Sequence, residues 1–83
     1  MTLDDRKNEL RSVLKEHPNI PYYINKNSWN DFTYGYYFDE DKKTWIFFEN
    51  EERGIRHEKQ MHNEEEALDK MCKLVEYDID RGR

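Results

Sequence analysis

Between positions 31 and 60 the chain alternates aromatic and polar residues and is broken twice by charged segments. The first run places an aromatic side chain at every second position, the period of a β-strand: Phe32, Tyr34, Tyr36 and Phe38. A second run, 44–49, is rich in the aromatic and β-branched residues that suit a pleated sheet. The polar segment 39–43 between the two runs favours a turn. This stretch therefore predicts a β-hairpin that the rest of the chain must cover.

A third strand is expected after a second turn at residues 50–54. Gly54 can adopt the positive φ that such a hairpin turn needs. The strand that follows, from Ile55 to about Gln60, is more polar than the first two. Upstream, segment 20–24 is extended and is expected to add a strand. This strand should lie at the edge of the sheet, because its proline lacks the N–H group that a central strand would need.

One helix is predicted before these strands in the sequence and one after them. Thr2 and Asp5 have the spacing of a capping box, and a proline at position 18 ends the first helix near Glu16. Asn63 caps the second helix, with Glu66 expected as its reciprocal partner. The apolar stripe of the second helix consists of Leu68, Met71, Cys72, Val75 and Ile79.

The sequence thus predicts a single α+β domain over residues 1–83, in the order α-(β)-β-β-β-α. Its sheet is expected to be a small antiparallel meander of three to four strands, with one face covered by the N- and C-terminal helices. The second strand carries apolar side chains on both faces, with Ile46 and Phe48 pointing away from the face of Trp45 and Phe47. We expect the N-terminal segment to wrap this far face; the alternative is a sheet that presents an aromatic patch to a partner.

The net charge of −5 is unevenly distributed along the chain. Segment 39–52 has six acidic residues against Lys42 and Lys43, a net charge of −4. Binding of nucleic acid needs a basic face, so this distribution disfavours nucleic acid as a partner. It suits a basic protein partner, although acidic residues also keep a small protein soluble.

Cysteine content and apolar runs indicate where the chain functions. Cys72 is the only cysteine, so no intrachain disulfide can form, which favours the reducing cytoplasm. The N-terminus lacks the apolar segment of a signal peptide, and the longest apolar run, 45–48, is too short to cross a bilayer. We therefore expect a cytoplasmic protein that is not bound to membranes.

The sequence contains no recognisable set of catalytic or cofactor-binding residues. His57 and His62 stand five apart on an expected strand, whereas the metalloprotease motif needs two histidines four apart on one helix face. Cys72 lies on an apolar helix stripe, where a thiol is a poor nucleophile. We therefore expect no enzyme activity, no metal and no cofactor.

Three motifs occur in an order that resembles a known family. They are Trp45-Ile46-Phe47-Phe48, Glu52-Arg53-Gly54 and Met61-His62-Asn63-Glu64-Glu65-Glu66-Ala67, preceded by Ile20-Pro21-Tyr22-Tyr23. Together they resemble the immunity protein 59 family, small proteins encoded beside polymorphic toxins in bacteria. The resemblance spans roughly residues 20–78. Met61 and Leu68 depart from it, since the family often has an aromatic residue and a cysteine at these positions.

The resemblance implies a cytoplasmic protein that neutralises a cognate toxin by binding it, without catalysis. We expect the toxin to be a basic, nuclease-type domain that is blocked by stoichiometric occlusion. One alternative is an acidic phage-type inhibitor that imitates nucleic acid; another is a non-catalytic regulatory domain that forms a weak homodimer. A large secreted-toxin gene ending just upstream would favour the immunity function.

The charge map predicts where such a toxin would bind. Acidic residues on turns are costly to bury without a cationic partner, and an aromatic anchor surrounded by charges is typical of a tight interface. The predicted contact residues are Asp39, Glu40, Asp41, Trp45, Phe47, Glu49, Glu51 and Glu52. For the Glu52-Arg53-Gly54 turn, a purely structural role is the alternative to toxin contact.

Overall fold

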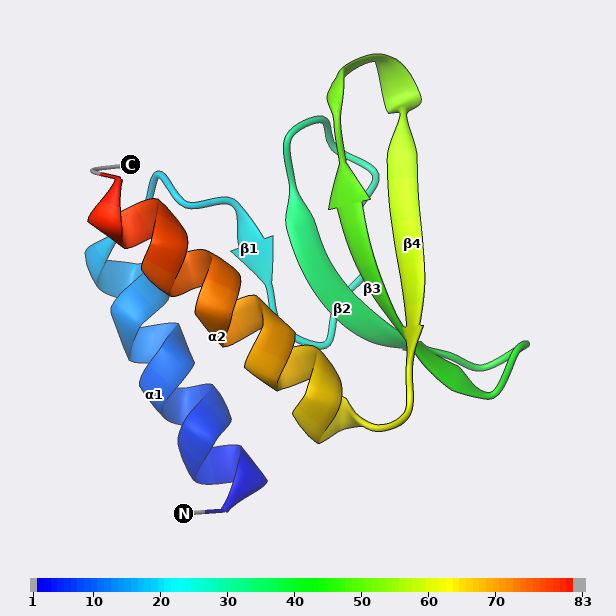
Figure 1. The fold of residues 1–83 in the computed structure, drawn as a ribbon, viewed down its shortest axis with the longest axis horizontal. Coiled ribbons are helices and arrows are strands. Elements are labelled where there is room, and N and C mark those ends of the chain that lie inside the picture. The colour runs from blue at the N-terminus through cyan, green and yellow to red at the C-terminus, as the bar shows by residue number, and fades with distance from the viewer. Residues whose placement is uncertain (1, 82–83) are drawn as a thin grey trace.

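The computed structural model describes residues 2–81, which form a helical layer packed on a four-stranded sheet (Figure 1). The elements are α1 (Leu3–Glu16), β1 (Tyr22–Tyr23), β2 (Tyr34–Asp39), β3 (Thr44–Asn50), the 3-10 turn η1 (Glu52–Gly54), β4 (Arg56–Met61) and α2 (Glu64–Asp80). Spatial strand order follows the chain, β1-β2-β3-β4. The α+β fold and the predicted order of its elements are confirmed.

The sheet is mixed, which corrects the expectation of a purely antiparallel one. Strands β2, β3 and β4 are antiparallel, but β1 runs parallel to β2 with Tyr23 opposite Gly35. Pro21 still takes part, because its carbonyl accepts a hydrogen bond from Tyr34 N–H at 3.0 Å. Gly35 is needed here, since a Cβ would lie 2.4 Å from the carbonyl oxygen of Tyr23. Two parallel strands require a crossover connection, and segment 24–33 provides it.

Both helices begin with the caps that the sequence predicts, with one difference. The Thr2 side chain accepts from Asp5 N–H and the Asp5 carboxylate accepts from Thr2 N–H, which completes the capping box of α1. In α2 the Asn63 side chain accepts from Glu66 N–H at 2.8 Å. The Glu66 carboxylate contacts His62 Nδ1 at 2.9 Å instead of serving as the expected reciprocal cap.

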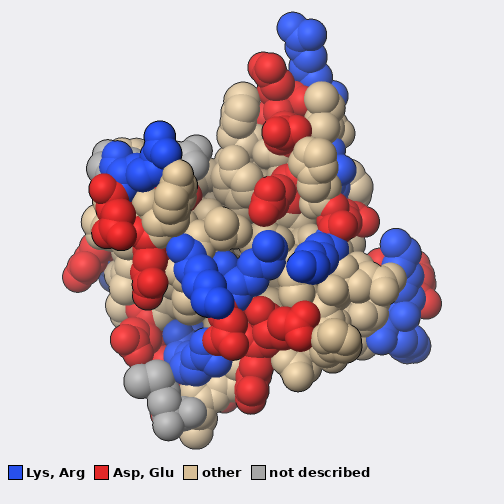
Figure 2. Space-filling model, viewed as in Figure 1, with Lys and Arg blue, Asp and Glu red and all other residues tan. Residues whose placement is uncertain are grey.

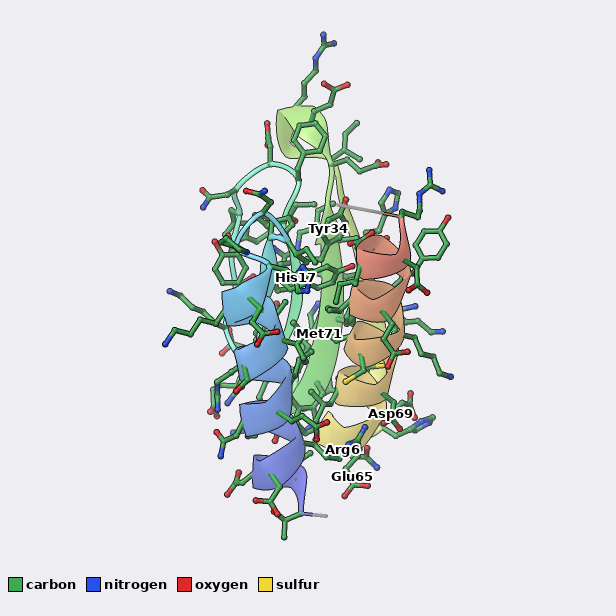
Figure 3. The ribbon with its side chains drawn as sticks, turned by 90° about the vertical axis from the view of Figure 1, so that its left-hand side faces the viewer. Arg6, His17, Tyr34, Glu65, Asp69 and Met71 are labelled. Atoms are coloured by element: carbon green, nitrogen blue, oxygen red, sulfur yellow. The ribbon has the colours of Figure 1, made fainter. Side chains whose placement is uncertain are left out.

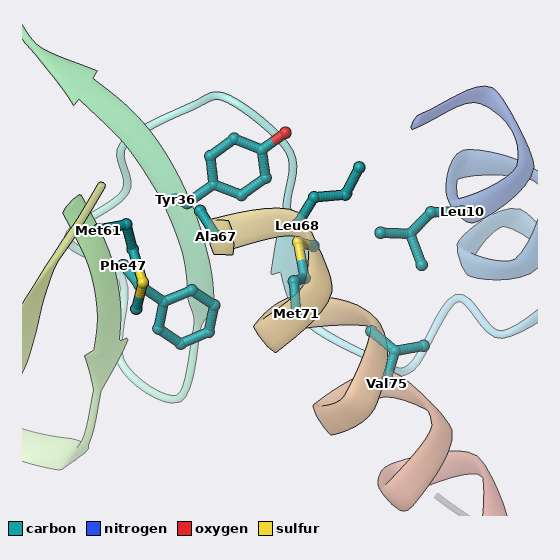
Figure 4. Close-up of a cluster of buried hydrophobic side chains, with 8 residues drawn as sticks. All are labelled: Leu10, Tyr36, Phe47, Met61, Ala67, Leu68, Met71 and Val75. Carbon is teal, nitrogen blue, oxygen red and sulfur yellow. The ribbon is translucent and has the colours of Figure 1, made fainter. Parts of the chain in front are cut away.

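The core lies between α2 and the helix-facing side of the sheet, and α1 adds to it from the far side of α2 (Figure 4). Its buried members are Leu10, Tyr36, Phe47, Met61, Ala67, Leu68, Met71 and Val75. Full burial of one large apolar side chain contributes about 1.5–3 kcal/mol, so this cluster supplies most of the driving force for folding. An ion pair between Arg6 and Asp69 joins the two helices at their outer side (Figure 3).

A polar junction joins α1, α2 and β2 at the edge of this core. The hydroxyl of Tyr36, which is completely buried, donates to Glu64 Oε2 at 2.8 Å, and Lys7 Nζ donates to the same oxygen at 3.0 Å. Burial and the adjacent Glu64 carboxylate both raise the pKa of the Tyr36 hydroxyl. Each polar group of the junction therefore has a partner, as buried polar groups require.

The far face of the sheet is covered by the crossover segment 24–33, which connects β1 to β2. Phe48 is completely buried there, and Ile46 is 1% exposed. Asn50, on the same face, donates from Nδ2 to the carbonyl oxygens of Ser28 (2.7 Å) and Asn30 (3.2 Å). These bonds hold the crossover segment against β3.

Phe32 lies outside the strand in which the alternating pattern had placed it. Strand β2 begins at Tyr34, and Phe32 has a left-handed backbone with φ of 58°. Thr33 is fixed between them, because its carbonyl accepts from Asn50 N–H at 2.8 Å. The chain must turn at Phe32 before it enters β2, so the strand begins two residues later than the alternating pattern predicted.

Gly54 has φ of 76°, as the turn prediction requires, and a Cβ there would meet no atom within 4 Å. Replacing Gly54 by Val would therefore act through the backbone alone and should destabilise the fold by about 1–3 kcal/mol. Gly54→Asn is the matched control, because asparagine tolerates the left-handed region. Thermal melts would check both variants; equal melting temperatures for Gly54→Val and the parent would contradict the strain at this turn.

Candidate protein-docking surface

The acidic residues predicted on the two turns fall at opposite ends of the sheet. Asp39, Glu40 and Asp41 lie on the β2–β3 turn, whereas Glu51 and Glu52 lie on the β3–β4 turn (Figure 1). The seven residues of β3 separate these turns by about 20 Å at the usual rise per residue. The structure therefore does not bring the acidic residues into one patch.

Part of the acidic charge at the β2–β3 turn has a local role. Asp39 Oδ1 accepts from the backbone N–H groups of Asp41 (3.0 Å) and Lys42 (3.1 Å), which stabilises the turn. Lys43 Nζ lies 3.8 Å from Glu40 Oε2, with both side chains exposed. This turn combines three acidic and two basic residues and exposes no large hydrophobic side chain.

The residues predicted on β3 are less accessible than expected. Phe47 is 1% exposed and packs in the core beneath α2, so its assignment as a contact residue is corrected. Trp45 is half-buried, with its ring centroid 5.2 Å from that of Phe38 and 5.9 Å from that of Tyr36. Glu49 is also half-buried. A central strand covered on both faces leaves little side-chain surface for a partner.

The other end of the sheet combines acidic and apolar side chains. We call residues 29–32 and 51–55 the tip, since the β3–β4 turn projects beyond both helices (Figure 3). Among the described residues, four large hydrophobic side chains are exposed, and three belong to the tip: Trp29 (67%), Phe32 (52%) and Ile55 (51%). The sequence pattern did not single out Trp29 or Ile55 and had placed Phe32 in a strand. The sequence pattern did not single out Arg56 either.

The guanidinium of Arg56 connects the tip to the sheet. It lies 3.9 Å from the ring centroid of Trp29 and 4.5 Å from that of Phe48, and the side chain is only 6% exposed. In addition, Arg56 donates to Glu58 Oε2 (2.8 Å), to the Ser28 carbonyl oxygen (2.9 Å) and to an asparagine side chain. The flat face of the guanidinium stacks on the aromatic rings, and its N–H groups donate hydrogen bonds in the plane of the group.

Acidic residues predominate on the tip. Asp31 Oδ2 accepts from Arg53 N–H at 3.3 Å, which joins the two segments, and Glu51 pairs with His57 at 2.9 Å. Together with Glu52, the tip has three carboxylates and one guanidinium, all exposed. Figure 2 shows charged side chains of both signs on this projecting end, and acidic and basic groups interspersed over the rest of the visible face. That face has no continuous acidic surface of the kind that imitates nucleic acid.

Comparison with family models, with curated proteins and with solved structures found no match.

Side chains that could support chemistry are dispersed. Within residues 2–81, no three histidine, cysteine, aspartate or glutamate side chains are grouped so that they could hold a metal ion. His57 pairs with Glu51 and His62 with Glu66, and the two histidines lie at opposite ends of β4. Neither described helix is long and apolar enough to span a bilayer.

Cys72 lines a cavity of about 280 Å³ between α1 and α2, together with apolar side chains such as Leu10 and Val75 and with the charged Arg6 and Glu76. Burial raises the pKa of the Cys72 thiol, and the nearby Arg6 guanidinium only partly opposes this effect. The thiol is therefore protonated at neutral pH and weakly nucleophilic.

Modification of Cys72 would test this assignment. A raised pKa leaves less thiolate at pH 8, so a disulfide reagent should react more slowly with the folded chain than with the chain in urea. The reaction rate, followed spectroscopically from pH 7 to 10, should rise only at a pH above that at which an ordinary cysteine thiol ionises. Equal rates for the folded and unfolded chain would contradict a protected thiol.

Replacing Arg56 by Lys would test the connection between tip and sheet. Lysine keeps the charge but loses the planar stack and the forked hydrogen bonds, so the variant should unfold at lower urea concentration, with a loss of about 1–3 kcal/mol. Arg53→Lys, at an exposed position of the same tip, should change stability by less than about 0.5 kcal/mol. Equal losses in both variants would mean that the stack does not stabilise the fold.

Proposed function

We propose that this protein is a non-catalytic inhibitor of the immunity type, which binds and occludes a basic, nuclease-type toxin domain in the bacterial cytoplasm. The observation that carries the proposal is the tip, where Trp29, Phe32 and Ile55 are exposed beside Asp31, Glu51 and Glu52. The motif resemblance at Trp45–Phe48, Glu52–Gly54 and Met61–Ala67 supports the immunity class.

The chemistry of the tip fits binding to a basic protein. Apolar side chains at the centre of an interface supply most of the affinity, because their burial removes hydrophobic surface from water. Carboxylates around them attract a cationic partner and increase the rate of encounter. The tip has both kinds of group, whereas the β2–β3 turn has the charges without exposed large hydrophobic side chains.

Inhibition in this proposal is stoichiometric. One inhibitor covers one toxin domain, and the toxin is inactive as long as the complex lasts. Because the chain does no chemistry on the toxin, dissociation should restore full toxin activity. The acidic residues determine how fast the complex forms, and the apolar residues determine how long it lasts.

Co-expression would test the function directly. We expect a toxin gene immediately upstream, whose toxin domain should arrest growth when produced in the cytoplasm, and the intact chain should restore growth. The two purified proteins should form a one-to-one complex in size-exclusion chromatography. Growth arrest that persists despite soluble inhibitor, with no complex formed, would contradict the proposal.

Charge variants would locate the interface. Glu51→Gln with Glu52→Gln should slow association about tenfold at low salt and reduce its salt dependence. The matched control, Glu40→Gln with Asp41→Asn, removes the same number of charges from the other end of the sheet and leaves the Asp39 turn intact. Association rates measured by stopped flow would decide; an effect confined to the control pair would place the interface at the β2–β3 turn.

A further inference from the structure

Phe32 combines an unfavourable backbone with an exposed side chain. Its φ of 58° lies in the left-handed region, where a bulky residue is a genuine outlier because its Cβ crowds the backbone. The residue is 52% exposed, so this conformation does not serve to bury the ring within the chain. Glycine or asparagine would satisfy the backbone better at this position.

The residues on both sides of Phe32 are fixed to the sheet and to the β3–β4 turn. Before it, Asp31 accepts a hydrogen bond from Arg53 N–H. After it, Thr33 is 6% exposed, donates from Oγ1 to the Asn30 carbonyl oxygen at 2.6 Å and accepts from Asn50 N–H. Strained conformations persist only where such surrounding contacts determine them, and they concentrate at functional sites.

The ring of Trp29 is also held in place by a contact within the chain. The Arg56 guanidinium lies over one face of its ring, 3.9 Å from the ring centroid, and the residue is 67% exposed. A ring that is already positioned loses little conformational freedom on binding, which increases affinity. The tip therefore has two exposed aromatic side chains that are ordered before any partner arrives.

We infer that Phe32 is a preorganised anchor: its left-handed backbone holds the ring outward so that it enters an apolar recess with a rim of lysine and arginine side chains on the partner protein. This inference rests on the proposed function and specifies the partner surface. A recess fits the tip because the β3–β4 turn projects from the molecule (Figure 3), and a basic rim complements Asp31, Glu51 and Glu52.

A second copy of the chain fits the tip less well. Two tips in symmetric contact would bring their carboxylates together, with Arg53 as the one exposed basic side chain of each tip. Like charges facing each other disfavour association. A basic partner of another sequence avoids this repulsion.

The decisive variant is Phe32→Asn, which removes the ring and relieves the backbone. Its melting temperature should equal or exceed that of the parent, whereas its affinity for the toxin domain should fall about 30-fold or more, as at a hot spot. Phe32→Tyr keeps the ring and should retain affinity within a few-fold. The matched control is Tyr77→Ala, which removes an equally exposed aromatic side chain (55%) from α2 and should leave affinity unchanged.

Each outcome decides between the two proposals. If the parent chain neither binds nor protects, the proposed function fails; a lower melting temperature of Phe32→Asn then overturns the anchor as well, and a higher one supports its preorganisation. If the parent protects and Phe32→Asn binds equally well, the anchor is wrong while the function stands. If sedimentation shows a parent dimer that Phe32→Asn dissociates, the recess belongs to a second copy and the basic partner surface is overturned.

Discussion

The guanidinium of Arg56, held between the rings of Trp29 and Phe48, is the contact on which the far side of the molecule depends. Phe48 belongs to a central strand and would be exposed on this face without a cover. The cover is an irregular segment with no helix or strand of its own, so it needs directional contacts to stay in place. Arg56 provides them by stacking in one direction and donating hydrogen bonds in another. Its charge is compensated by Glu58, which makes the burial of a cation affordable.

The two faces of the sheet are thus covered by different physical means. On the helix side, α2 packs aliphatic side chains against Tyr36 and Phe47, a contact that is strong but tolerant of small shifts. On the far side, Asn50 and Arg56 hold the crossover segment through hydrogen bonds whose geometry permits little movement. The far side, held by these hydrogen bonds, is the one that carries the exposed aromatic residues of the tip. The rigid placement of the tip, the proposed binding surface, follows from the hydrogen-bonded half of the structure.

Local signals made much of the fold predictable from the sequence. Thr2, Asn63 and Gly54 act through their own backbone or through residues three positions away, so their roles are visible in a short window. The period of two likewise assigned the strand faces correctly. Consecutive turns of a meander lie at opposite ends of a sheet, so the separation of Asp39–Asp41 from Glu51–Glu52 was also deducible from the predicted topology.

The remaining features depend on contacts between segments far apart in the chain. The parallel direction of β1 and the stacking of Trp29 on Arg56 link residues whose proximity no local pattern encodes. Phe32 continues an alternating pattern, but the crossover overrides it. Phe47 was assigned to a surface because aromatic residues are common in interfaces, yet a central strand beneath α2 buries it. Tertiary context decides such positions, and β-patterns report it poorly.

The parallel pairing of β1 with β2 has a consequence for how this molecule can diverge. After β1 the chain must return along the sheet before β2 begins, and ten residues, 24–33, make this journey. The same ten residues form the far-face cover and half of the tip, so their number is set by the dimensions of the sheet. Insertions and deletions would be accommodated at the β2–β3 turn, where residues 40–43 are exposed. If the tip binds a partner as proposed, new partners would be reached by exchanging side chains at positions 29 and 32 while the length of the crossover stays constant.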